Sequence, residues 1–387
     1  MIRFPVAPRA ALLALLCAFA GRAGAAAFAP NDVEVCSAAY GVTDPEFDSE
    51  SRFMTFVNAQ VQVRVALMNA DGSIGTPGCV GVLVDQGAWG WPDSTGYQGP
   101  EWGRSANGLE IFYTRFLPDG KTPALAHAVA NGKAWQASYL ASGSRRSTIV
   151  ASTDATAPEA RIMYVARTMS GQDLPMWREA EEPASETLYP GSYSFSTVTG
   201  SVPRWVANER AISMVEPDTS GVMQAVRFDI DTQTAQVLTH DDGNKAEVWI
   251  WSAPEFGGDR VMTTVVDGCC LRVYRQLGSR WVLVNTIKVA SLAPGLSAMY
   301  SPQPQVYKGR SYVVVEFGNQ LKDPASQIWL LAIDPSVPLA RQLSDPQTQA
   351  VRTEPETLVT KQGFYVYYSQ QVGADQPRSL RRVSTGL

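Results

Sequence analysis

Gly99-Pro100-Glu101-Trp102, followed after a short turn by Leu109-Glu110-Ile111-Phe112-Tyr113-Thr114, is the clearest copy of a pattern that recurs along the chain. A proline, a polar residue and often an aromatic residue precede a turn, and the β-branched and aromatic residues after the turn favour a strand. The other copies are Asp44-Pro45-Glu46-Phe47, Val202-Pro203-Arg204-Trp205, Ala253-Pro254-Glu255-Phe256, Ser301-Pro302-Gln303 and Glu354-Pro355-Glu356.

The spacing of these copies indicates a repeat. Their prolines stand at positions 45, 100, 203, 254, 302 and 355, and the one long interval, 100 to 203, is twice the usual step. It predicts a degenerate copy without proline at residues 147–152, before a strand at 161–165. A period of about 50 residues with several short strands per unit is typical of propeller blades. We therefore predict an all-β fold, a single β-propeller of seven four-stranded blades, with six blades as the alternative.

Each unit is expected to hold four strands. In the fourth unit these are a segment ending at Trp205, then residues 211–215, 223–229 and 236–239, separated by turn residues. The last unit ends near residue 383 with no sequence left for an outer strand. We predict that residues 31–36 supply that strand and close the ring, which would cover an exposed sheet edge.

The N-terminal segment differs in composition from the rest of the chain. Arg3 and Arg9 precede an apolar run over residues 10–20, and small residues follow, an order typical of a secretory signal peptide. We predict a signal peptide over residues 1–25, cleaved after Ala25 or Ala27, and a propeller over residues 30–387. No later segment has the roughly 18 uninterrupted apolar residues of a membrane span, so we expect a secreted or periplasmic protein without membrane insertion.

Charge and cysteine content indicate which partners and which cellular compartment to expect. The net charge is −5, with 32 basic and 37 acidic residues, which argues against nucleic acid as a partner. We expect a monomer. Cys36 and Cys79 are predicted to form a disulfide in an oxidising compartment. For the neighbours Cys269 and Cys270 two interpretations stay open, a strained vicinal disulfide or two free thiols.

The repeats resemble those of TolB-like propellers. The resemblance rests on Gly99-Pro100-Glu101-Trp102 and on residues 223–231 leading to Gln236-Val237-Leu238-Thr239, because those propellers have a Pro-x-Trp turn before one strand and Leu-Thr at the end of another. The present turn, residues 103–108, departs from the Ser-Pro-Asp-Gly of that family. The resemblance implies a propeller fold and an exported setting; members of the family bind proteins, bind ligands or act as enzymes, so it implies no single function.

The residue after each motif proline is the main candidate for function. If the copies are equivalent, Glu46, Glu101, Glu255 and Glu356 ring one mouth of the channel, interrupted by Arg204 and Gln303. Converging like charges raise the pKa of at least one carboxyl group and favour a counter-charge, for which Arg204 is a candidate. The alternative is a solvated rim whose glutamates only satisfy strand ends. With Asp44, the same four glutamates are the candidate acids and bases of a glycosidase.

Two other features could contribute to a binding site. Trp89, Trp91 and Tyr97 lie in a glycine- and proline-containing connection just before Glu101, where flat rings could stack on a sugar or pack between blades. Cys269 and Cys270, if bonded, would form a rigid apolar plate at a mouth. The ligand-binding set predicted from the sequence is Trp89, Trp91, Tyr97, Glu101, Arg204, Cys269 and Cys270.

The absent motifs limit the chemistry. The chain has only two histidines, so we expect no His-rich zinc site. We expect no bound metal, and the alternative is a hard cation such as calcium, held by oxygen ligands. No nucleophile elbow, phosphate loop or dinucleotide fingerprint is present, and no cofactor is expected. The preferred hypothesis is an exported module that binds a glycan or other small ligand. The alternatives are a glycoside hydrolase or polysaccharide lyase, and a scaffold for a protein partner.

Overall fold

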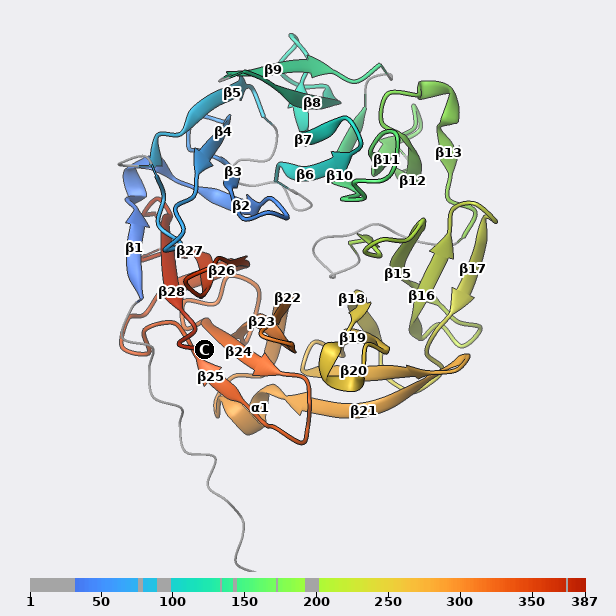
Figure 1. Ribbon diagram of the computed structural model, residues 1–387, viewed down its shortest axis with the longest axis vertical. Coiled ribbons are helices and arrows are strands. Elements are labelled where there is room, and N and C mark those ends of the chain that lie inside the picture. The colour runs from blue at the N-terminus through green and yellow to red at the C-terminus, as the bar shows by residue number, and fades with distance from the viewer. Residues whose placement is uncertain are drawn as a thin grey trace, which may run out of the picture.

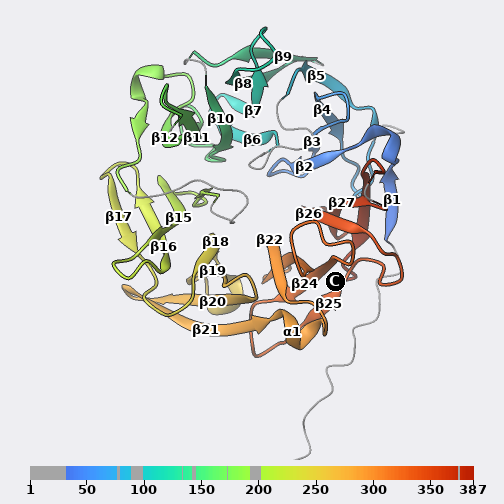
Figure 2. The same cartoon turned by 180° about the vertical axis from the view of Figure 1, so that it is seen from behind.

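The molecule is a ring of seven antiparallel four-stranded sheets. A computed structural model describes residues 32–75, 79–88, 99–132, 134–141, 145–171, 173–191, 202–373 and 375–387. The sheets stand like blades around a central axis, as both views show (Figures 1 and 2). The predicted seven-bladed all-β propeller is confirmed, and the six-bladed alternative is excluded. The predicted signal peptide lies outside the described residues.

In each blade the strands follow one another from the central axis to the rim, except that the last blade takes its outer strand from the N-terminus. Blade 1 consists of β2 (Thr43–Phe47), β3 (Phe53–Val57), β4 (Gln62–Leu67) and β5 (Val82–Gln86). Blade 2 consists of β6 (Glu101–Ser105), β7 (Gly108–Phe116), β8 (Pro123–Asn131) and β9 (Ala134–Tyr139). Blade 3 consists of β10 (Arg146–Ala151), β11 (Arg161–Arg167), β12 (Asp173–Glu179) and β13 (Thr187–Leu188).

The remaining blades follow the same plan. Blade 4 has the four predicted strands, although the outer one begins and ends two residues earlier than predicted. They are β14 (Arg204–Trp205), β15 (Ala211–Pro217), β16 (Met223–Asp229) and β17 (Thr234–Val237). Blade 5 consists of β18 (Lys245–Ser252), β19 (Arg260–Val266), β20 (Cys270–Leu277) and β21 (Arg280–Lys288). Blade 6 consists of β22 (Ala298–Tyr307), β23 (Arg310–Gly318), β24 (Gln327–Ala332) and β25 (Ala340–Gln342). Blade 7 consists of β26 (Val351–Val359), β27 (Phe364–Gln371), β28 (Ser379–Ser384) and β1 (Val33–Cys36).

Helical structure in the described residues is limited to single turns. These are η1 (Ala38–Tyr40), η3 (Pro183–Ser185), η4 (Pro254–Phe256) and α1 (Val289–Leu292). None of them has the length or the apolar character that a membrane span requires.

The hydrophobic core lies between the blades. Successive side chains of a strand point to opposite faces, and here each face meets a neighbouring blade. Val313 and Val315 of β23 therefore pack with blade 5, whereas Tyr312 and Val314 pack with blade 7. Because both faces are buried, the central strands read as continuous apolar runs rather than as alternating ones. Each fully buried valine contributes roughly 1.5 to 3 kcal/mol through the hydrophobic effect.

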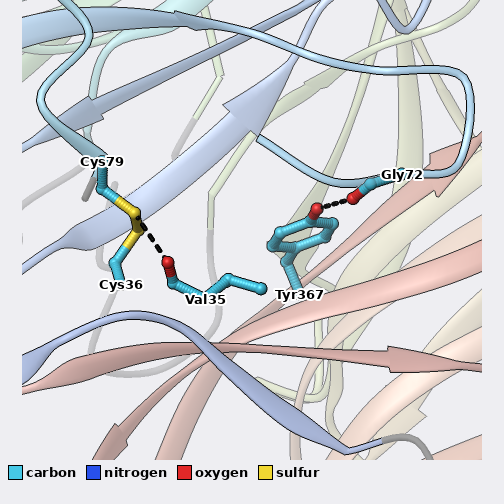
Figure 3. The surroundings of a disulfide bond; sticks show 5 residues. All are labelled: Val35, Cys36, Gly72, Cys79 and Tyr367. Atoms are coloured by element: carbon cyan, nitrogen blue, oxygen red, sulfur yellow. Dashed lines mark hydrogen bonds between the residues drawn. A yellow bond between two sulfur atoms is a disulfide. The ribbon is translucent and has the colours of Figure 1, made fainter. Parts of the chain in front are cut away.

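The ring is closed by β1, as predicted. This strand pairs antiparallel with β28, so that the first and the last strand of the described structure lie side by side (Figure 1). The predicted disulfide between Cys36 and Cys79 is present, with the two Cα atoms 5.5 Å apart, and it ties β1 to blade 1 (Figure 3). Beside it, the hydroxyl of Tyr367 donates a hydrogen bond to the carbonyl of Gly72 and so joins blade 7 to blade 1.

In the part of the chain that the structure describes, five of the seven innermost strands contain a β-bulge at the same place. In each, the register with the second strand shifts around a residue with positive φ, and the bulge turns the following side chain relative to the strand. These residues are Asp44, Thr148, Glu247, Ser301 and Glu354, with φ between 47° and 58°. In three of the five the next residue is the motif proline, which has no N–H to donate to the ladder.

Candidate functional site

The motif proline places one polar side chain on the innermost strand of five blades. Directly after it come Glu46, Glu101, Arg204, Gln303 and Glu356, in blades 1, 2, 4, 6 and 7. Each is the first residue to pair with the second strand, either at the start of the innermost strand or directly after its bulge. In the two remaining blades, Val150 and Trp249 stand at the corresponding place. The sequence copies in these five blades are therefore structurally equivalent.

Glu255 does not belong to this set, which corrects the expected ring. Pro254 and Glu255 form part of η4, in the turn after β18 rather than on it. The carboxylate of Glu255 accepts hydrogen bonds from the N–H and the hydroxyl of Ser311, at 2.9 and 3.1 Å, and so joins blade 5 to blade 6. The bulge of blade 5 is Glu247, which no proline follows, and this is why the motif pointed to the wrong residue.

Asp44 and the carboxyl groups around it form the centre of the site. The N–H of Gly99 donates to the carboxyl of Asp44, which links blade 2 to blade 1. A Cβ atom at position 99 would lie 2.4 Å from that carboxyl oxygen, so only glycine fits. The N–H of Asp44 in turn donates to Glu354, at 3.2 Å, which links blade 1 to blade 7.

The electrostatics show that these carboxyl groups act on one another. Burial, followed by the charges of Glu354 and Glu101, raises the pKa of Asp44 to about 8. Burial and the neighbouring carboxyl groups also raise the pKa values of Glu46 and Glu356 well above their ordinary range. Like charges in a partly dehydrated space disfavour full ionisation. We call Asp44, Glu46, Glu101 and Glu356 the channel acid cluster.

Arg204 is the cation that faces the cluster. Its guanidinium lies over the ring of Trp249, 4.7 Å from the centroid, and 3.8 Å from a carboxylate oxygen of Glu247. Burial lowers the pKa of Arg204, but Glu247 and then Glu101 raise it, and the net shift is upward. Arg204 in turn lowers the pKa of Asp44, Glu46 and Glu356, although less than burial raises them. Arg204 therefore sets a fixed positive charge against the four carboxyl groups of the cluster.

Glu356 connects the cluster to a pocket. It is 8% exposed and accepts a hydrogen bond of 2.7 Å from Nε2 of Gln303. It also lines a cavity of 380 Å³ between the β2–β3 turn and the innermost strands of blades 6 and 7, where Asp48, Glu50 and Gln305 are further polar lining residues. Most of the lining residues are polar, and three of them carry carboxyl groups, so the cavity suits a polar ligand.

The other residues predicted for binding lie apart from the cluster or outside the described structure. Trp89, Trp91 and Tyr97 are not among the described residues. Cys269 and Cys270 lie at the turn between β19 and β20 and are free thiols, so the vicinal disulfide is not formed. Burial and a hydrogen bond with Cys269 raise the pKa of Cys270 to about 11, which disfavours the reactive thiolate.

Sequence reasoning missed Glu247, Glu354 and Glu316. The first two are bulge residues, and their common signal is the position before the motif proline or its equivalent. Glu316 lies on the second strand of blade 6, inside the apolar run of residues 312–317, and its side chain is fully buried. The sequence signal for Glu316 is a single carboxyl group inside a run of apolar residues.

The fold and the channel geometry define this protein as a seven-bladed β-propeller with an acidic centre. No protein-family model matches the chain, and no curated protein matches its sequence. Of the resemblance to TolB-like repeats, the propeller fold is what the structure shows.

Solved structures share the fold. The chain is similar to the β-propeller domain of Cps50 (Swd1) from Myceliophteria thermophila, with a TM-score of 0.53, 11% identity, and coverage of 92% of this chain and 99% of that one. A protein of unknown function from Dyadobacter fermentans matches with a TM-score of 0.50, 12% identity and coverage of 92% and 98%. The propeller domain of the Trilobed protease from Pyrococcus furiosus matches with a TM-score of 0.49, 9% identity and coverage of 89% and 95%. At these identities the likeness shows the fold alone.

Proposed function

We propose that the protein is an exported β-propeller that binds a glycan or another small polar ligand at the channel acid cluster. The observation that carries the proposal is the convergence of Asp44, Glu46 and Glu356, whose pKa values burial and mutual repulsion raise. Partly dehydrated carboxyl groups that repel one another cost folding free energy, which a bound ligand would offset. The disulfide between Cys36 and Cys79 supports export, because such bonds persist in oxidising compartments.

The protonation of the cluster suits hydroxyl groups. A protonated carboxyl group donates one hydrogen bond, and an ionised one only accepts. With the pKa of Asp44 at about 8, the cluster offers donors and acceptors together at neutral pH. A sugar hydroxyl both donates and accepts, and the guanidinium of Arg204 over Trp249 supplies a further donor beside an aromatic ring. Calcium is the other ligand that this chemistry allows, because it binds six to eight oxygen atoms.

A thermal-shift screen against glycans and divalent cations tests the proposal. We expect a ligand that stabilises the native protein, and the substitutions Glu46→Gln and Glu101→Gln to weaken its Kd at least about tenfold, or 1.4 kcal/mol. Glu255→Gln is the matched control, since it makes the same change in another copy of the motif outside the cluster, and it should leave the Kd unchanged. Equal loss in all three variants, or no stabilising ligand at all, would refute the proposal and favour a protein partner.

The pH dependence separates the two ligand classes. A cation competes with protons for Asp44, whose pKa is about 8, so calcium binding should strengthen as the pH rises from 6 to 9. A neutral glycan needs protonated donors as well, so its binding should not strengthen over that range. Titration of each stabilising ligand at both pH values by calorimetry distinguishes these outcomes.

The glycosidase alternative rests on the same raised pKa values. A carboxylic acid that stays protonated at neutral pH can act as a general acid on a glycosidic bond. Hydrolysis of a bound glycan, abolished by Glu46→Gln or Glu356→Gln and retained by Glu255→Gln, would establish this activity. Binding without product release over prolonged incubation would exclude it.

A further inference from the structure

A second cluster of donor atoms lies away from the channel, between blades 2 and 3. Nδ1 of His127, on β8, lies 3.1 Å from a carboxylate oxygen of Glu110, on β7, and 3.2 Å from one of Glu181, which follows β12. All three donor atoms lie within 4.8 Å of one another. Glu110 and His127 are diagonal neighbours on the face of blade 2 that packs on blade 3, because Phe112 lies opposite His127 in the register.

This arrangement is not explained by hydrogen bonding alone. A neutral imidazole has at most one proton on Nδ1, yet two carboxylate oxygens approach that single atom. In the other tautomer Nδ1 is an acceptor and faces two further acceptors. His127 and Glu110 are 9% and 7% exposed, so water screens this conflict poorly. A cation between the three atoms would use one lone pair from each and remove the conflict.

We propose that Glu110, His127 and Glu181 form a binding site for a divalent transition metal ion, with Zn²⁺ as the ion that fits the donors. Imidazole nitrogen and carboxylate oxygen bind zinc at about 2.0 to 2.2 Å, which gives donor separations of about 3.3 Å in a tetrahedral site. The separations of 3.1 and 3.2 Å around Nδ1 match that geometry. The nitrogen donor disfavours calcium and magnesium, which prefer oxygen.

The surroundings add negative charge and an access route. The N–H of Glu181 donates to a carboxylate oxygen of Glu159, at 2.8 Å, which places a third acidic residue at the site. The side chain of Glu181 is 56% exposed, so an ion can enter from solvent and a water molecule can complete its coordination. The nearby guanidinium of Arg178 donates to the carbonyls of Ala141 and Ala180. The metal would join blade 2 to blade 3, independently of the channel acid cluster. A zinc site that contains histidine differs from the expectation drawn from the sequence, which was that no metal is bound.

Calorimetric titration of the purified, metal-free protein with zinc chloride tests this site. We expect one strong site, with Kd weakened at least about tenfold by His127→Gln and by Glu181→Gln. The chain has only two histidines, so His240→Gln is the matched control. His240 is exposed in the turn after β17, and its loss should change the Kd less than about twofold.

A second readout locates the ion. With two histidines, the imidazole NMR spectrum contains two sets of signals, and zinc should shift the set that His127→Gln removes. Glu181→Gln changes an exposed side chain and should fold normally. If His127→Gln does not fold, zinc binding by Glu181→Gln tests the proposal. Zinc binding that survives both substitutions, that depends on His240, or that is no tighter than the binding of magnesium would overturn the proposal. Glu46→Gln should retain zinc binding, so failure here is distinguishable from failure of the proposed function.

Discussion

At the scale of single residues, Glu316 is the clearest conflict between sequence and environment. Its side chain is fully buried on β23, and neither carboxyl oxygen has a hydrogen-bond partner among the described residues. Burial, and then the charge of Glu354, raises its pKa well above the ordinary value. The folded protein therefore keeps this proton at a pH at which the unfolded chain has released it. Stability from Glu316 is present at low pH and is lost as the pH rises.

We expect Glu316→Gln to stabilise the protein at pH 8, because glutamine mimics the protonated acid and does not ionise. The gain in unfolding free energy should be about 1 kcal/mol or more, the value of one pKa unit, and should vanish near pH 4, where glutamate is protonated in both states. Urea unfolding at several pH values measures it. Glu34→Gln, on the exposed face of β1, is the control and should show no such trend. A gain that is independent of pH would contradict the explanation.

At the scale of elements, the repeat in the sequence and the repeat in the structure mark different sets of innermost strands. The proline motif marks the innermost strand in blades 1, 2, 4, 6 and 7, whereas the bulge marks it in blades 1, 3, 5, 6 and 7. A bulge needs one residue with positive φ but no particular side chain after it, so Glu247-Val248 serves as well as Asp44-Pro45. The repeat can therefore be counted from prolines, but its members cannot be aligned from them reliably.

The edge element β1 is held by the disulfide, and its removal is a test at this scale. Cys36 and Cys79 are 43 residues apart, and a loop of that length stabilises by roughly 3 to 4 kcal/mol. We expect the double substitution to serine at both positions to lower the unfolding free energy by that amount, measured in guanidinium chloride. Serine at both Cys269 and Cys270 is the control, since those thiols are free, and its cost should be much smaller. Equal costs would show that loop closure is not the cause.

At the scale of the whole molecule, one buried carboxylate lies where the ring closes. Asp32 accepts hydrogen bonds of 2.7 Å from Nε of Arg381, 2.7 Å from the hydroxyl of Tyr368 and 3.0 Å from the N–H of Asp345. Its side chain is fully buried. These bonds fasten the start of β1 to blade 7 and to the segment between blades 6 and 7.

We expect Asp32→Ala to cost about 3 to 5 kcal/mol, because it leaves the partly buried guanidinium of Arg381 without its partner. Asp173→Ala is the control. It breaks a pair with Arg167 at a similar distance of 2.6 Å, but both side chains are largely exposed, and such pairs contribute about 1 kcal/mol or less. Hydrogen exchange should show faster opening of β1 and β28 in the first variant only. Similar stabilities of the two variants would mean that β1 is held by its other contacts.

The sequence alone determined the fold class, the closing strand and the disulfide, and it favoured seven blades over six. Each of these follows from local signals, namely turn residues, strand-forming runs, a fixed period and cysteine number, and such signals need no knowledge of three-dimensional neighbours. It also identified Glu46, Glu101, Glu356 and Arg204 as candidates, since proline marks their strands directly.

Only the tertiary structure decided which charged groups meet. Glu255 lies outside the expected set, and Glu354 accepts a hydrogen bond from Asp44 of the cluster. Glu110, His127 and Glu181 come together from two blades. The physical reason is that contacts between blades depend on bulges and on the packing of one sheet face against the next, which a one-dimensional period does not encode. The chemistry of the sites therefore depends on how the blades pack, whereas the propeller ring itself can be predicted from the sequence.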